Sequence, residues 1–136
     1  MQDSLQRFVD AQARVIDHVR RELRAGQKTS HWMWFVFPQI KGIGHSASAQ
    51  RFAIADLIEA RAYLAHPILG PRLHECTKLV LAVRGRSLSD IFGYPDDLKF
   101  RSCMTLFWRA SADPLFSDAL TKLCDGVEDP ETLKRL

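Results

Sequence analysis

The side chains best suited to chemistry lie in one stretch, residues 28–39, with the sequence KTSHWMWFVFPQ. An exposed histidine exchanges protons near neutral pH, so His31 can act as a general acid or base. Ser30 and His31 precede an unbroken apolar run at residues 32–37, and we expect Ser30 to cap a helix there. The free N–H groups at such a helix start can bind an anion, with Lys28 and Lys41 nearby in the sequence adding positive charge.

Aromatic side chains in the same stretch can form the wall of a binding cleft. Trp32 and Trp34 are two of the chain's three tryptophans, and their spacing prevents them from sharing one helix face. Two interpretations stay open. Either residues 32–37 are a buried core helix, or one tryptophan faces a cleft and stacks on a planar ligand. Gln39 can fix the local loop or hydrogen-bond to the edge of such a ligand.

A second polar set follows at three-residue intervals, with Asp96, Lys99 and Ser102 on one face of a predicted helix. This face is either simply solvated or lines the same cleft as His31. In the second case the cleft holds both proton-transferring groups and phosphate-binding lysines. The candidate catalytic residues are His31, Asp96 and Lys99, and the candidate ligand-binding residues are Lys28, Ser30, Trp32, Trp34, Gln39 and Ser102.

Several classes of protein are disfavoured by the composition. The chain has no Cys-x-x-Cys or His-x-x-x-His pair, so we predict no metal site and no cofactor. Its three cysteines are odd in number and far apart, which favours reduced, buried thiols in a cytoplasmic protein. We also expect no membrane association, because no apolar run approaches the roughly 20 residues of a membrane span and no secretory signal precedes the first helix.

The net charge of +3 is compatible with anionic ligands but modest for a nucleic-acid-binding protein. Basic residues gather before the aromatic stretch, at the predicted C-terminal end of the first helix. The helix dipole stabilises cations at this position, which explains the cluster without a ligand. Weak nucleic-acid binding through this patch therefore ranks last among the functions considered. The patch comprises Arg20, Arg21, Arg24 and Lys28.

The spacing of apolar residues predicts helices almost throughout. An apolar stripe from Leu5 to Leu23 predicts one long first helix, and a helix opened by Pro95 is expected to bury Leu98 and Trp108. A strand at residues 32–37 would have no partner. Capping residues mark three later helix starts, at Ser87 with Asp90, at Asp113-Pro114 and at Asp129-Pro130. We predict a compact all-α array of seven or eight helices, forming a single domain over residues 1–136.

Four segments resemble a bacterial protein family, domain of unknown function 1810, whose members are sometimes labelled calpastatin-like. The resemblance covers nearly the whole chain in order, with Cys103 standing where a serine is expected. It implies an all-α fold and brings no activity, cofactor or catalytic residue. The segments are residues 30–39 (SHWMWFVFPQ), 60–70 (ARAYLAHPILG), 90–93 (DIFG) and 96–107, with DDLK and SCMTLF.

Three functions follow from these patterns. The first is binding of a small anionic, partly aromatic ligand, such as a nucleotide or an ADP-ribose-like molecule, in a cleft beside residues 30–39, with acid–base catalysis as an extension. The second is a non-enzymatic interaction module or homodimer that uses the aromatic stretch as core or interface. The third is the weak nucleic-acid binding described above. The sequence favours the first and leaves open whether the chain is an enzyme.

Overall fold

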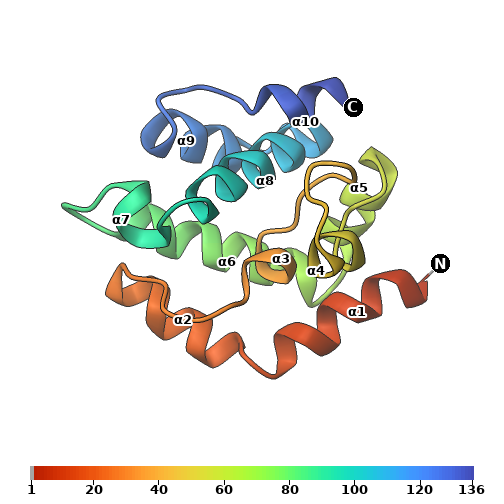
Figure 1. The fold of residues 1–136 in the computed structure, drawn as a ribbon, viewed down its shortest axis with the longest axis horizontal. Coiled ribbons are helices and arrows are strands. Elements are labelled where there is room, and N and C mark those ends of the chain that lie inside the picture. The colour runs from red at the N-terminus through yellow and green to blue at the C-terminus, as the bar shows by residue number, and fades with distance from the viewer. Residues whose placement is uncertain (1) are drawn as a thin grey trace.

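The computed structural model describes residues 2–136 and confirms the all-α prediction. Ten helices occur in this range, against the seven or eight expected, and the only strand-like pairing is a parallel bridge between Ile40 and Ile54 (Figure 1). No helix within these residues is both long and apolar enough to cross a membrane. The helices are α1 (Gln2–Ala13), α2 (Ile16–Ala25), α3 (Met33–Val36), α4 (Ala47–Arg51), α5 (Leu57–Ala65), α6 (Leu69–Ala82), α7 (Leu88–Phe92), α8 (Asp96–Ser111), α9 (Pro114–Leu123) and α10 (Pro130–Lys134).

The prediction of one long first helix is wrong. The chain leaves the helix at Arg14 and restarts at Ile16, because Val15 takes a non-helical conformation with φ −130° and ψ −5°. Both α1 and α2 bury their apolar side chains against the same core, so the apolar stripe continues across the break. Apolar periodicity reports which side is buried and carries no signal for a bend of this kind.

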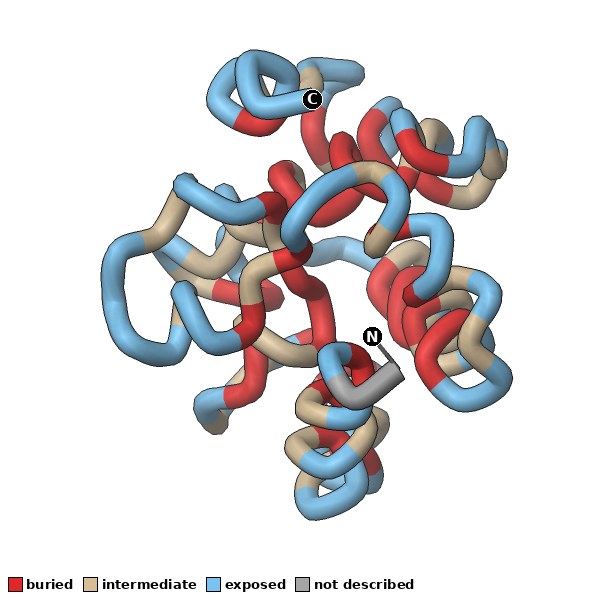
Figure 2. The backbone as a smooth tube through the Cα atoms, turned by 90° about the vertical axis from the view of Figure 1, so that its right-hand side faces the viewer, coloured by how far each residue is buried: buried red, intermediate tan, exposed pale blue. Residues whose placement is uncertain are grey.

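One hydrophobic cluster fills the centre of the molecule, where buried residues gather (Figure 2), and α3 lies in the middle of the fold (Figure 1). Rings from α7, α8 and the turn after α3 meet there: the Phe37 ring centroid lies 5.1 Å from that of Phe100 and 5.8 Å from that of Phe92. The aromatic stretch is therefore mostly core. On α8, the predicted inward position of Leu98 is wrong, since Leu98 is 42% exposed, whereas Trp108 is partly buried and packs against the core.

The three cysteines are free and buried, as the sequence predicts. Burial raises the pKa of each thiol, to about 12 for Cys76, so the reactive thiolate is disfavoured at neutral pH. These side chains serve packing.

Helices α5 and α6 meet at a joint that requires glycine. The Nδ1 atom of His66 accepts hydrogen bonds from the backbone N–H groups of Ile68 and Leu69, at 3.1 and 3.3 Å, and turns the chain. A Cβ atom on Gly70 would lie 2.1 Å from the carbonyl oxygen of Leu64, a backbone atom that no rotamer change can move. The two helices can approach this closely only because residue 70 has no side chain.

We expect Gly70→Ala to lower the free energy of unfolding by about 3 kcal/mol, because the added methyl group must push two helix backbones apart. Urea denaturation measures this loss. Gly85→Ala is the control, because Gly85 has φ +71° but no atom lies within 4 Å of the added Cβ. In this variant only the left-handed backbone conformation of alanine lowers the free energy of unfolding, by about 1 kcal/mol. Equal losses in the two variants would contradict the close approach at Gly70.

Candidate functional site

Ser30 does not cap the aromatic helix, which corrects the prediction made for it. The residue preceding α3 is Trp32, and no side chain caps this helix. The Ser30 hydroxyl instead donates to the Glu22 carboxylate at 2.6 Å, together with the backbone N–H groups of Thr29 at 2.7 Å and Ser30 at 3.1 Å. The predicted anion position before the aromatic run is thus filled by the chain's own carboxylate.

Glu22 is ionised in this cradle. Desolvation raises the pKa of its carboxyl, but the hydrogen bonds from Ser30, Thr29 and Trp32 outweigh it and lower the pKa to about 2. No cation takes part in this set of hydrogen bonds. The carboxylate ties the turn after α2 to the start of the aromatic stretch.

The two tryptophans of the stretch have different environments. Trp32 is fully buried and its indole N–H donates to Glu22 at 3.0 Å, so both its ring and its polar group serve the fold. Trp34 is half-buried, and no hydrogen bond engages its indole N–H within the described chain. Of the two interpretations left open by the sequence, the core position holds for Trp32, whereas Trp34 lines a pocket.

Asp96 lies between two lysines. Its carboxylate is 2.8 Å from the Lys28 ammonium and 3.1 Å from that of Lys99, and the Lys28 side chain is only 7% exposed. Desolvation raises the pKa of Asp96, but the hydrogen bonds and charges of the two lysines outweigh it and lower the pKa. Lys28 also lies over the Trp32 ring at 5.2 Å, and Lys99 over the Trp34 ring at 4.7 Å.

A pocket of about 280 Å³ opens beside the second half of the aromatic stretch. Its base is built by backbone pairing: the Lys41 N–H donates to the Ile54 carbonyl and the Ile54 N–H donates to the Gln39 carbonyl, both at 2.8 Å. This pairing brings residues 39–41 beside residues 53–55, with α4 between them in sequence. The pocket is lined by Trp34, Gln39, Ile40, Lys41, Gly42, Gly44, His45, Ala49, Gln50, Phe52 and Ala53.

The lining combines an apolar wall with polar groups that have no partner. Among the described residues, no hydrogen bond engages the Gln39 carboxamide or the Lys41 ammonium. The lining contains no aspartate or glutamate. Cations lie over both ring systems that line it, with Lys99 over Trp34 and Arg51 over Phe52 at 5.2 Å. Lys41 is the one lysine, arginine or carboxylate side chain of the lining, so the lining carries a net positive charge.

The glycine loop that forms the rim of the pocket is held from the C-terminal end of the chain. Arg135 donates to the Gly42 carbonyl at 3.2 Å and is itself held by the carbonyl and carboxylate of Glu131. Gly42 has φ +99°, and a Cβ there would lie 2.7 Å from Nε of Arg135. Both the backbone conformation and the close approach of the arginine favour glycine at this position.

The predicted site residues are brought together only in part. Trp34 and Gln39 line the pocket, and Lys99 adjoins it over Trp34. His31 is exposed and, within the described chain, has no hydrogen-bond partner. Ser102 is 4% exposed and donates to the Asp129 carboxylate at 3.0 Å, where it supports the start of α10.

Lys41, named from the sequence as a cation near the aromatic stretch, also lines the pocket. His45 and Gln50 line it as well and were not predicted as site residues. The sequence offers one signal for them, the Gly42-Ile43-Gly44 turn that directly follows the aromatic stretch. A two-glycine turn does not by itself indicate which distant segment it faces. The pairing with residues 53–55 that completes the pocket is a tertiary contact.

Comparison with known proteins gives the family. No curated protein matches the chain. Its structure is similar to the crystal structure of the conserved hypothetical protein Rv1873 from Mycobacterium tuberculosis, with a TM-score of 0.96 and 57% sequence identity. The match covers 97% of this chain and 95% of that one. The model of the family described as protein of unknown function (DUF1810) matches residues 2–136, and the chain belongs to this family.

Proposed function

We propose that this protein binds a small ligand with a planar aromatic part and an anionic group in the pocket beside Trp34. One observation carries the proposal: three polar groups without partners, on Trp34, Gln39 and Lys41, border an apolar pocket that no acidic residue lines. Binding sites combine an apolar wall with a few convergent polar groups in this way. In this arrangement the ring of the ligand lies against Trp34, Gln39 bonds to its edge, and Lys41 pairs with the anionic group.

The volume of the pocket limits the size of the ligand. At about 280 Å³ it lies near the lower end of the range for small-molecule sites, roughly 300–1,000 Å³. A single base with one phosphate suits this space, whereas NAD or an ADP-ribose-like molecule would insert one end only. A mononucleotide-sized ligand is therefore favoured over a dinucleotide.

The proposal is one of binding, because the candidate acid–base residues are poorly suited to proton transfer here. The pKa of Asp96 is lowered by its two lysines, and a general base works best with a pKa near the working pH. His31 does not line the pocket. Catalysis at this pocket would therefore fall to His45, the one histidine of its lining.

The alternative of an interaction module uses the aromatic stretch as core or as interface, and the interface version requires an exposed stretch. Four of its six apolar residues are buried, namely Trp32, Met33, Val36 and Phe37. They support the core and leave little apolar surface for a partner. We therefore retain ligand binding as the proposed function.

A thermal-shift screen against mononucleotides, NAD, ADP-ribose and small organic phosphates tests the proposal. A ligand at about 100 times its dissociation constant adds about 2.7 kcal/mol, a rise of several degrees in Tm. We expect a mononucleotide to be the strongest of the panel. If no compound of the panel raises the Tm at millimolar concentration, the proposal is contradicted.

We expect Trp34→Ala to weaken binding of the screened ligand by about 10–100-fold, since one stacked ring contributes roughly 1–3 kcal/mol. Titration calorimetry measures the loss. His31→Ala is the matched control, because this exposed side chain lies in the same stretch but outside the pocket lining. A loss with His31→Ala as large as that with Trp34→Ala would move the site to the start of the stretch.

A further inference from the structure

A second feature, far from the pocket, is an uneven distribution of charge. Residues 14–27 and 69–86, which comprise α2 with its flanking turns and α6 with the turn that follows it, contain eight of the chain's 19 basic residues and three of its 16 acidic residues. These two segments therefore carry a net charge of +5, and the rest of the chain carries −2. The modest charge of the whole protein conceals this asymmetry.

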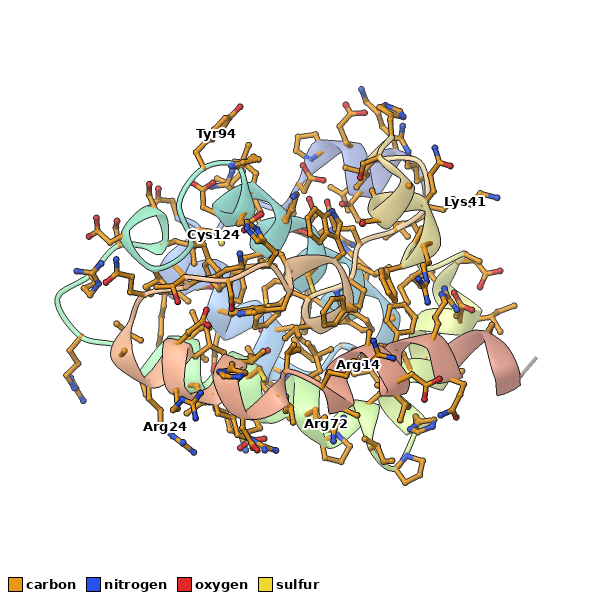
Figure 3. All side chains as sticks on the ribbon, turned by 60° about the horizontal axis from the view of Figure 1, so that its bottom comes forward. Arg14, Arg24, Lys41, Arg72, Tyr94 and Cys124 are labelled. Atoms are coloured by element: carbon orange, nitrogen blue, oxygen red, sulfur yellow. The ribbon has the colours of Figure 1, made fainter. Side chains whose placement is uncertain are left out.

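The two segments form one face. Helices α2 and α6 run side by side in the same direction, joined near their middle by Arg20 and Glu75 at 3.0 Å, and at their C-terminal ends by Arg86, which donates to the Gly26 carbonyl at 2.8 Å. Figure 3 looks onto this side, where the labelled Arg14, Arg24 and Arg72 lie along the two helices and the labelled Lys41 of the pocket lies well away from them. We call this surface the α2–α6 face.

The acidic residues of the α2–α6 face are already engaged. A single arginine, Arg20, pairs with both Asp17 at 3.2 Å and Glu75 at 3.0 Å. Glu22 is turned inward and accepts hydrogen bonds from the turn that follows α2. Arg86 is also engaged, since it lies near Asp90 and donates to the carbonyls of Gly26 and Asp90. Five exposed cations remain without an acidic partner among the described residues: Arg14, Arg21, Arg24, Lys78 and Arg84.

We propose that the α2–α6 face binds the phosphate backbone of a nucleic-acid duplex, independently of sequence. Four of its five cations without an acidic partner are arginines, whose planar forks match phosphate oxygens. Helix α6, with 14 residues, is about 21 Å long, a length over which duplex DNA presents about twelve phosphates. The inference is independent of the pocket beside Trp34.

The chemistry of the α2–α6 face disfavours two other polyanions. Single strands are held by exposed aromatic rings on which bases stack, and residues 14–27 and 69–86 contain no Phe, Tyr or Trp. A membrane surface is held by apolar side chains that insert between lipids, and none of the exposed large apolar side chains of the described chain lies in these segments. The face is basic, and the exposed large apolar side chain that borders it in sequence is Ile68, directly before α6.

Fluorescence anisotropy with two labelled DNA duplexes of unrelated sequence, each about 16 base pairs, tests the proposal over 50–200 mM KCl. We expect equal affinity for both duplexes. A plot of the logarithm of the association constant against the logarithm of the KCl concentration should have a slope of about −0.9 for each phosphate contacted. In Arg24→Gln/Arg84→Gln, the magnitude of this slope should decrease by about 1.8 and the affinity by about 10–100-fold at 100 mM salt.

The control is Lys122→Gln/Lys134→Gln, which removes the same charge from exposed positions outside the face and the pocket. It should retain at least half of the duplex affinity. Absence of duplex binding at 50 mM salt, or equal losses in the two double variants, would overturn the proposal. So would binding to phosphatidylserine vesicles by a protein that does not bind the duplexes.

Discussion

Asp96→Ala will lower the free energy of unfolding by about 3–5 kcal/mol, because it leaves the Lys28 ammonium buried without a counter-charge. The Lys28 side chain is 7% exposed and lies 2.8 Å from the carboxylate. Removing one member of a buried pair costs far more than the pair contributes, since the remaining charge keeps its desolvation penalty. Chemical denaturation followed by tryptophan fluorescence measures the loss.

Two further variants distinguish the stability lost through the unpaired buried charge from the stability lost through poorer packing. Lys28→Met/Asp96→Ala removes both charges, and we expect it to recover most of the stability lost in Asp96→Ala. Lys99→Met removes the second, more exposed partner of Asp96 and should cost less than about 1 kcal/mol. A double variant that is less stable than Asp96→Ala would show that Lys28 is well hydrated and that its burial is not the cause.

The parts of the fold that depend on local chemistry were predictable. Ser87 and Asp90 form the expected capping box at α7, and Asp113 and Asp129 accept hydrogen bonds from the first turns of α9 and α10. Each of these signals acts within three or four residues, so the sequence contains all of the participants. The all-α prediction rests on many such signals and on apolar spacing.

The candidate site was predictable only for those of its residues that lie close together in the sequence. Trp34 and Gln39 of the 28–39 stretch line the pocket, and Asp96 pairs with both Lys28 and Lys99. What the sequence lacks is a signal for which donor meets which acceptor across the fold. Glu22 stands on α2 as one of several charged residues, and nothing in its neighbours predicts that it fills the anion position beside Ser30.

Glu22→Gln will make the protein less stable at neutral pH and less sensitive to acid. In the native state Glu22 has a pKa of about 2, against an ordinary value of 4.5, because the hydrogen bonds from Ser30, Thr29 and Trp32 favour the charged form. A group whose pKa is lowered by folding stabilises the protein above its unfolded-state pKa, and this contribution is lost as the pH falls through the native value. The stabilising contribution of Glu22 is therefore lost as the pH falls from about 4.5 to about 2.

We expect this carboxylate to contribute about 2 kcal/mol at pH 7, a value reduced for solvent screening because Glu22 is only partly buried. Urea denaturation of the native protein and of Glu22→Gln at a series of pH values should give curves that differ by this amount at pH 7 and converge near pH 2. Asp10→Asn is the matched control, since Asp10 is an exposed carboxylate on α1. Parallel curves for the native protein and Glu22→Gln down to pH 2 would place the acid sensitivity elsewhere. Convergence would show that one internal carboxylate, in place of an external anion, holds the turn on which the aromatic stretch begins.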